Sequence, residues 1–155
     1  MSMPSMSMPP MSMPPMSMPE ARLDHAGLSV ADLAAMAAWY GDVFGFQVEL
    51  TLRVEPLDLD IVMLVHPGAG DRLELLYRPG STRPATPADP GEAALRQGLG
   101  HIAFDVPDLD TAFDRAVAAG AWPVMSPRPS PESGVRMAFV ADPEGNLVEL
   151  LHRPA

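Results

Sequence analysis

The chain of 155 residues contains neither cysteine nor lysine. Without cysteine, disulfides, zinc–thiolate sites and thiol nucleophiles are excluded. Without lysine, Schiff-base chemistry and a lysine general base are excluded. The ten basic residues are therefore all arginines, and they face 20 acidic residues, which gives a formal net charge of -10. Because such an acidic chain repels phosphate groups, we expect no binding to nucleic acid or to anionic membrane surfaces.

Long hydrophobic runs are also missing. No apolar segment has the ~20 residues that a membrane-spanning helix needs, and the N-terminus lacks the basic and apolar regions of a secretory signal. We therefore expect a cytoplasmic protein. The first 20 residues are instead four repeats, MSMPS, MSMPP, MSMPP and MSMPE. Proline recurs there too often for a helix or a central strand, so residues 1–20 are predicted to form a disordered low-complexity tail.

From residue 21 onward the hydrophobic pattern predicts the same five elements twice, in the order strand, helix, strand, strand, strand. The first helix is bounded by Asp32 as its N-cap and Gly45 after its end. In the first half these elements are expected at residues 22–30, 33–44, 46–54, 57–65 and 72–77. In the second half they are expected at residues 100–106, 109–119, 122–125, 135–141 and 146–151. A short helix over 92–97 and a proline-rich loop over 126–134 are also expected.

The two halves also match in sequence. Residues 25–34 align with residues 101–110, and residues 73–79 align with residues 148–154. A repeat of this kind predicts an α+β fold of two βαβββ modules that pair their sheets into a cupped, mixed surface. We assign residues 21–79 to module one, residues 80–98 to a linker and residues 99–155 to module two.

The aligned positions include one histidine and one glutamate in each half: His25 and Glu74, then His101 and Glu149. Taken singly, a strand histidine, or a glutamate between leucines, usually has a structural or solvent-facing role. The repetition of both positions favours a shared site instead, because pseudo-symmetry would bring two imidazoles and two carboxylates together. Such a set suits one divalent ion of nickel, zinc, manganese, cobalt or iron.

Neighbouring residues on the same strands are candidates for contact with a substrate. Side chains alternate across a strand, so Ser29 shares a face with His25, and Asp105 shares a face with His101. Met63, on the third expected strand, is added as a further pocket residue without a comparable argument. Glu49 has the pattern of an exposed strand residue, although it could also act as an extra base.

Four stretches carry a resemblance to a known family: residues 23–30, 39–46, 100–106 and 139–150. They resemble the glyoxalase / bleomycin-resistance / extradiol-dioxygenase group, the vicinal oxygen chelate superfamily, and the likeness extends over residues 21–155. The resemblance implies paired βαβββ modules around a metal site. It also places the ligands near the start of the first strand and within the fourth strand of each module, which here are His25, Glu74, His101 and Glu149.

Among these relatives, the ligand set resembles that of glyoxalase I, and it differs from that of methylmalonyl-CoA epimerase at Glu74, where the epimerase often has Gln. It implies a metal-dependent lyase, isomerase or epimerase that acts on a small oxygenated metabolite through a metal-stabilised enediolate or enolate. Glu149 would be the catalytic base, with Glu74 as its partner on the opposite face. Two alternatives stay open: a protein that sequesters an antibiotic or metabolite, and an iron-dependent extradiol-type dioxygenase.

The substrate and the assembly are less constrained. Ser29 and Arg78 stand where bacterial glyoxalase I members usually carry Arg and Asn, so the sequence does not indicate glutathione over a CoA thioester. In this superfamily the two modules of a site come from one chain or from two. We expect a homodimer.

Overall fold

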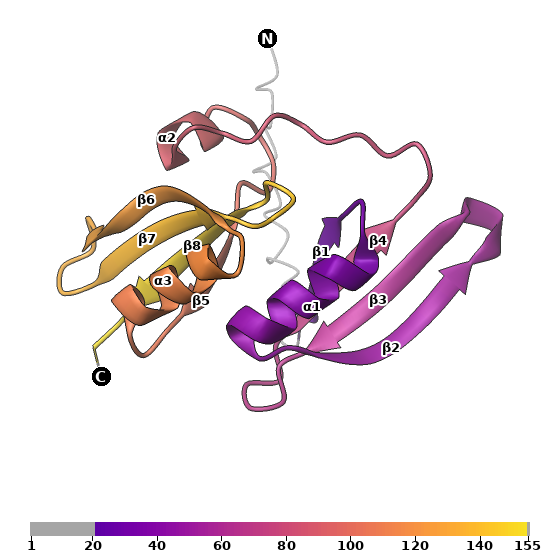
Figure 1. The fold of residues 1–155 in the computed structure, drawn as a ribbon, viewed down its shortest axis with the longest axis horizontal. Helices are drawn as coiled ribbons and strands as arrows, with labels where there is room; N and C mark the ends of the chain where they lie inside the picture. Colours follow the sequence, from indigo (N-terminus) through magenta and orange to yellow (C-terminus); the bar gives the residue numbers. More distant parts are fainter. Residues whose placement is uncertain (1–20, 155) are drawn as a thin grey trace, which may run out of the picture.

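The structure is a computed structural model that describes residues 21–154 of the chain (Figure 1). The tail predicted over residues 1–20 lies outside the described residues. Module one contains β1 (Ala26–Ser29), α1 (Leu33–Phe44), β2 (Gln47–Val54), the short 3-10 helix η1 (Glu55–Leu57), β3 (Leu59–Val65) and β4 (Arg72–Tyr77). After α2 (Pro90–Ala93), module two contains β5 (Ile102–Asp105), α3 (Leu109–Ala118), β6 (Trp122–Pro129), β7 (Arg136–Ala141) and β8 (Leu147–His152).

The predicted α+β class is confirmed, because each module is a four-stranded mixed sheet with one helix. The strand orders are β1-β4-β3-β2 and β5-β8-β7-β6. In both sheets the first strand of the module runs parallel to the fourth, and the other pairs are antiparallel. The register also repeats: Gly27 lies opposite Glu74 in sheet one, and Ala103 lies opposite Glu149 in sheet two.

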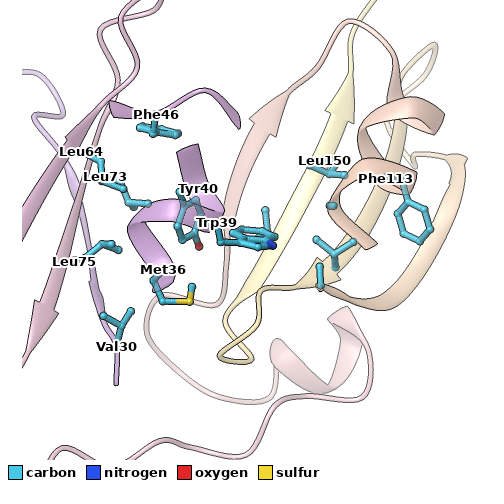
Figure 2. Close-up of a cluster of buried hydrophobic side chains, with 14 of the residues drawn as sticks. Val30, Met36, Trp39, Tyr40, Phe46, Leu64, Leu73, Leu75, Phe113 and Leu150 are labelled. Carbon is cyan, nitrogen blue, oxygen red and sulfur yellow. The ribbon is translucent and has the colours of Figure 1, made fainter. Parts of the chain in front are cut away.

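Helix α1 lies between the two modules, and α3 packs against the sheet of module two (Figure 1). Helix α1 supplies Met36, Trp39 and Tyr40, which are all buried. Figure 2 shows these side chains between the sheet of module one and the residues of module two. Burying a large apolar side chain stabilises a fold by roughly 1.5–3 kcal/mol, so this cluster holds the two modules together. Its other members include Leu64, Leu73, Leu75, Phe113, Val148 and Leu150.

A buried carboxylate joins the modules at the turn between β7 and β8. Asp142 is fully buried and accepts hydrogen bonds from the Tyr40 hydroxyl at 2.9 Å and from the backbone N–H groups of Glu144 and Asn146 at 3.0 and 2.8 Å. The Asn146 side-chain amide donates a further bond at 2.8 Å. Burial raises the pKa of Asp142, and burial beside Asp142 raises the pKa of Tyr40 well above its usual value. The Tyr40 hydroxyl therefore stays protonated and donates a hydrogen bond to Asp142.

Glu144, two residues further on, makes a second link between the modules. Its carboxylate accepts hydrogen bonds from the backbone N–H groups of Ala31 and Asp32 at 2.7 and 2.8 Å, at the start of α1. It also pairs with Arg83 of the linker. Negative charge near the N-terminus of a helix is stabilising, so Glu144 fixes α1 and the linker against module two.

Helix α1 and strand β4 have the bounds that the sequence predicts. Five elements, β2, β3, α3, β7 and β8, differ from the prediction by one or two residues at an end, and four others differ more. Strand β6 continues through Ser126–Pro129, where a loop was expected. Helix α2 covers Pro90–Ala93 rather than 92–97. Strands β1 and β5 are four residues long, so His25 and His101 lie just before them rather than inside them. Of the helices within residues 21–154, none has the length and apolar character that crossing a bilayer requires.

Candidate metal centre

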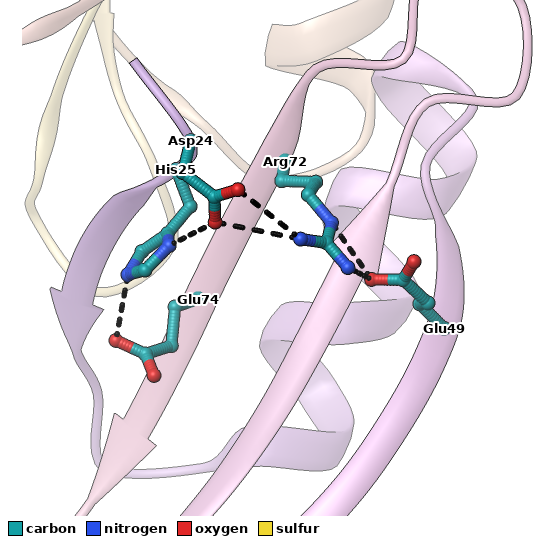
Figure 3. Close-up of polar contacts among 5 residues, drawn as sticks. All are labelled: Asp24, His25, Glu49, Arg72 and Glu74. Atoms are coloured by element: carbon teal, nitrogen blue, oxygen red, sulfur yellow. Dashed lines mark hydrogen bonds and ion pairs between the residues drawn. The ribbon is translucent and has the colours of Figure 1, made fainter. Parts of the chain in front are cut away.

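The first histidine and glutamate of the predicted set lie next to each other in module one. His25 immediately precedes β1, and Glu74 is the third residue of β4. The His25 Nε2 atom is 3.5 Å from Glu74 Oε2 (Figure 3). Leu73 and Leu75, on either side of Glu74, are buried towards α1. Because side chains alternate along a strand, Glu74 projects from the sheet face that turns away from the helix.

Module two repeats this arrangement with His101 and Glu149. His101 Nε2 is 3.1 Å from Glu149 Oε2. Val148 and Leu150 are fully buried in the core, so Glu149 also lies on the face away from its helix. The imidazole of His101 packs edge-on against Phe139, with ring centroids 5.4 Å apart. Each module therefore presents one imidazole nitrogen and one carboxylate oxygen side by side, in corresponding positions.

The four predicted ligands thus come together as two pairs. Within residues 21–154 no group of three or more His, Asp or Glu side chains is placed to hold a metal ion. One imidazole and one carboxylate are half of the four protein ligands predicted for one ion, and nitrogen and oxygen donors suit zinc, nickel, cobalt, manganese or iron. The chemistry of the residues therefore fits a divalent ion, and each module supplies half of such a site.

A chain of charged groups extends from the first pair but was not expected from the sequence. Asp24 accepts a hydrogen bond from His25 Nδ1 at 2.8 Å, and Arg72 lies 3.4 Å from both oxygens of Asp24 (Figure 3). The Arg72 Nε atom donates to Glu49 at 2.9 Å. The hydrogen bond from His25 lowers the pKa of Asp24, and the hydrogen bond to Glu49 raises the pKa of Arg72. The aspartate directly before the first histidine was the signal that could have indicated this network.

The three residues predicted to contact a substrate occupy different places. Ser29 lines a cleft of about 510 Å³ between β1, the linker and the start of β5. Asp105 lines a separate cleft of about 570 Å³ and accepts a hydrogen bond from the backbone N–H of Arg153 at 3.2 Å. Met63 lies opposite Glu74 on β3 and is 9% exposed. Met63 is therefore adjacent to the first pair, whereas Ser29 and Asp105 line two different clefts.

The linker covers part of the second pair's sheet face. Ala93 of α2 is buried against Phe139 and Leu147. Phe139 lies opposite Glu149 in the register of β7 and β8, and Leu147 is two residues before Glu149 on the same face. This contact excludes water from one side of the Glu149 carboxylate, whose side chain is 15% exposed.

Other parts of the two ligand-bearing faces are apolar and open. Leu50 pairs with Met63, and Leu52 pairs with Ile61, so both leucines share the face of Glu74. They are 39% and 45% exposed. Trp122, at the start of β6, is 70% exposed. Leu50 and Leu52 thus lie on the face of Glu74 in sheet one, and Trp122 lies on the face of Glu149 in sheet two.

The comparison with known families agrees with the fold. The family model described as Glyoxalase/Bleomycin resistance protein/Dioxygenase superfamily matches residues 22–150. The chain belongs to this superfamily.

Individual members of the superfamily are similar to this chain in sequence and in structure. The chain is 30% identical over 129 residues to a protein of Vibrio parahaemolyticus described as a probable lactoylglutathione lyase, a match that covers 80% of this chain and 85% of the relative. The structure of this chain is similar to that of a glyoxalase family protein from Bacillus cereus, with a TM-score of 0.72 and 21% identity, over 90% of this chain and 100% of the other. Glyoxalase I of Leishmania major, described as trypanothione-dependent, matches with a TM-score of 0.63 and 27% identity, over 85% and 86% of the chains.

Proposed function

We propose that this chain is a metal-dependent enzyme of the glyoxalase superfamily, a lyase, isomerase or epimerase, whose site is shared by two copies of the chain. His25 and Glu74 of one copy and His101 and Glu149 of the other would hold one divalent ion. The observation that carries the proposal is the repeated pair, with Nε2 to Oε2 distances of 3.5 and 3.1 Å on corresponding sheet faces.

Two features support assembly from two chains. Each pair lies on a sheet face that turns away from the central helices, and the described residues bring no third ligand to either pair. The same faces carry the exposed side chains of Leu50, Leu52 and Trp122. A twofold dimer that joins the first module of one copy to the second module of the other would cover these side chains. By symmetry it would form two equal sites.

The chemistry follows from the donors. A divalent ion held by these residues would supply electrophilic polarisation of substrate oxygens, which would make a neighbouring carbon–hydrogen bond easier to deprotonate. Glu149 accepts that proton and returns it, because its carboxylate is the more covered of the two and lies against the apolar Phe139 and Ala93 contact. Glu74 acts from the opposite side of the site, and Met63 beside it limits access of water.

The substrate class is proposed from the same geometry together with the relatives. A small molecule with two adjacent oxygen atoms and an acidic carbon–hydrogen bond fits a metal with two free positions. The name of the Vibrio relative suggests a thiol adduct of a 2-oxoaldehyde, and a 2-substituted acyl thioester is the other compound to screen. Both are to be tested with the metal-loaded protein.

The first experiment measures metal content by elemental mass spectrometry on protein purified without chelator or histidine tag. We expect about one divalent ion per chain in the wild type, and loss of the ion in the double variant His101→Ala, Glu149→Gln. The control is Asp110→Asn, which removes an exposed carboxylate paired with Arg136 and should keep the ion. No ion in the wild type after reconstitution with each of the five metals would contradict the enzyme proposal and favour sequestration.

A mixed-dimer experiment tests the assignment to two chains. His25→Ala and Glu149→Gln each disable both sites of a homodimer. When the two variants are co-expressed, a mixed dimer contains one site with both changes and one intact site, so about a quarter of all sites should be restored. Metal content and turnover that stay at the level of the separate variants would show that both pairs act within one chain.

A further inference from the structure

The hydrogen bond between Asp24 and His25 determines which imidazole nitrogen carries the proton. An ionised carboxylate can only accept hydrogen bonds, so the Nδ1 atom, 2.8 Å from Asp24 Oδ2, must be the donor. In the neutral imidazole the Nε2 atom then keeps its lone pair. That lone pair points towards Glu74, 3.5 Å away, where the proposed ion would lie (Figure 3).

Asp24 is in turn oriented by charged neighbours. The Arg72 Nη1 atom is 3.4 Å from both carboxylate oxygens of Asp24, and the same guanidinium is held by Glu49 on β2 through its Nε atom at 2.9 Å. Figure 3 shows the resulting line of five side chains across β2, β4 and the segment before β1. Because Arg72 of β4 is anchored by Glu49 of β2, two strands away in the sheet, Asp24 has a fixed partner, although its side chain is 68% exposed.

Among residues 99–154 of module two, no corresponding network of charged groups adjoins the Nδ1 atom of His101. Gly100 precedes His101, and Leu147 occupies the position that Arg72 has in β4. Within residues 21–154, the Nδ1 atom of His101 has no hydrogen-bond partner. His101 is instead placed by its edge-on contact with Phe139. The two half-sites therefore have the same ligands but different support around them.

We propose that Asp24, held by Arg72 and Glu49, is a positioning residue that fixes His25 in the Nδ1–H tautomer, and that the module-one half-site is therefore preorganised for metal while the module-two half-site is not. The inference rests on the proposed function, since it assigns a role to Asp24 within the same metal site. Ligand histidines generally need a partner on the other ring nitrogen, and removal of such a partner typically weakens metal binding about 10–100-fold.

The decisive measurement is two-bond 1H–15N correlation NMR of the imidazoles in full-length, metal-free protein at mildly alkaline pH, where free imidazole is neutral. The chain has four histidines, and the signals of His25 and His101 are assigned from the variants His25→Gln and His101→Gln. We expect His25 to be the Nδ1–H tautomer in the wild type and to shift towards Nε2–H in Asp24→Ala. The control Asp110→Ala removes an exposed carboxylate of module two that contacts no histidine, and should leave His25 unchanged.

The substitution Gly100→Asp tests the same idea in module two, because it places an aspartate directly before His101, as Asp24 stands directly before His25. A Cβ at Gly100 would meet no atom within 4 Å, and the backbone there is not left-handed, so the side chain can be accommodated. We expect the new carboxylate to move His101 towards the Nδ1–H tautomer. If the tautomer of His101 stays unchanged, the residues at positions 24 and 100 do not explain the difference between the two half-sites. An Nε2–H tautomer of His25 in the wild type, or one that Asp24→Ala does not alter, would overturn the role of Asp24.

A zinc titration against a competing chelator gives the second readout. We expect Asp24→Ala to bind zinc about 10–100-fold more weakly than the wild type, with Asp110→Ala as the matched control. Equal affinity of the wild type and Asp24→Ala would overturn the inference and leave the proposed function intact. If the wild type binds no zinc or other divalent ion, the proposed function fails, and the tautomers in the metal-free protein still decide whether Asp24 positions His25.

Discussion

Asp142 concentrates four hydrogen bonds on one buried carboxylate: two from backbone N–H groups, one from the Tyr40 hydroxyl and one from the Asn146 amide. An asparagine in its place keeps one acceptor oxygen and directs an NH2 group at other donors. An unpaired buried polar group costs about 1–3 kcal/mol. Asp142→Asn should therefore lower the free energy of unfolding by about that amount, measured by chemical denaturation.

The same carboxylate makes a testable contribution to pH dependence. Burial raises the pKa of Asp142 in the folded protein above its ordinary value, so the folded state binds more protons than the unfolded state between these two values. The free energy of unfolding contributed by Asp142 must then fall as the pH rises through that range. We expect the stability advantage of the wild type over Asp142→Asn to shrink with rising pH across it.

The comparison with the variant is needed because exposed acids with lowered pKa values make the free energy of unfolding rise with pH, which is opposite to the effect of Asp142. Hydrogen bonds from Arg136 and Arg153 lower the pKa of Asp110 and of Glu132, and these groups lose their stabilisation as the pH falls. They are present in both proteins and cancel in the difference. A difference that stays flat, or that grows with pH, would contradict the raised pKa of Asp142.

At the residue level the repeat predicted on which sheet faces Glu74 and Glu149 lie, because a strand with period two fixes the face of every side chain. That the four residues are metal ligands stays a prediction. The repeat did not predict Asp142 and Glu144 as links between modules, since both contacts join residues that are more than 100 positions apart in sequence. Their equivalents in the first module, around His66 to Gly68, carry no acid. The repeat therefore gave no indication of them.

Local signals predicted individual elements well where a cap marks the boundary. Helix α1 begins after Asp32, whose side chain accepts a hydrogen bond from the Ala35 N–H at 2.9 Å, and ends at Gly45, whose φ is 80°. Strand β6 was cut short in the prediction because of its prolines. It is the edge of its sheet, where a residue without an N–H group can be tolerated. Position in the sheet is a tertiary property that a single strand's sequence does not contain.

The helix end gives a prediction at this scale. Gly45→Ala places a Cβ on a residue in the left-handed region, where nearby atoms leave room for it but the backbone is strained. We expect a loss of about 1–2 kcal/mol in the free energy of unfolding, measured by thermal or chemical denaturation. The control is Gly100→Ala, at a position with open space and no left-handed φ. Equal effects at the two positions would contradict the role of Gly45 as the C-cap.

For the molecule as a whole, the repeat predicted two modules of the same topology but not the direction in which the faces of Glu74 and Glu149 point. That direction is set by the packing of α1 between the modules and by the links through Tyr40 and Glu144. Such contacts depend on surfaces that exist only after each module has formed. The pairing of His25 with Glu74 and of His101 with Glu149 was therefore predictable from the repeat, whereas the separation of the two pairs was not.

The proposed dimer can be tested on strand β2. Leu50→Asp puts a charge on the open face beside Met63, and because Leu50 is 39% exposed the single chain should still fold. We expect a monomer by analytical ultracentrifugation, together with loss of bound metal. The matched control is Val48→Asp, whose partner Leu64 lies on the helix side of the sheet, and which should remain dimeric. A dimer with full metal content in Leu50→Asp would place the interface elsewhere.

Two of the edge strands, β2 and β6, differ in their tendency to pair with another chain and aggregate. Strand β6 is interrupted by Pro123, Pro127 and Pro129, which offer no N–H group to an incoming chain. Strand β2 has eight residues without proline, and Leu50 and Leu52 project from it. Long apolar edges template β-aggregation, and proline prevents it. Dilution or overproduction that outpaces assembly would therefore favour aggregates that start at β2, so pairing with a second copy would protect the protein's solubility as well as complete its site.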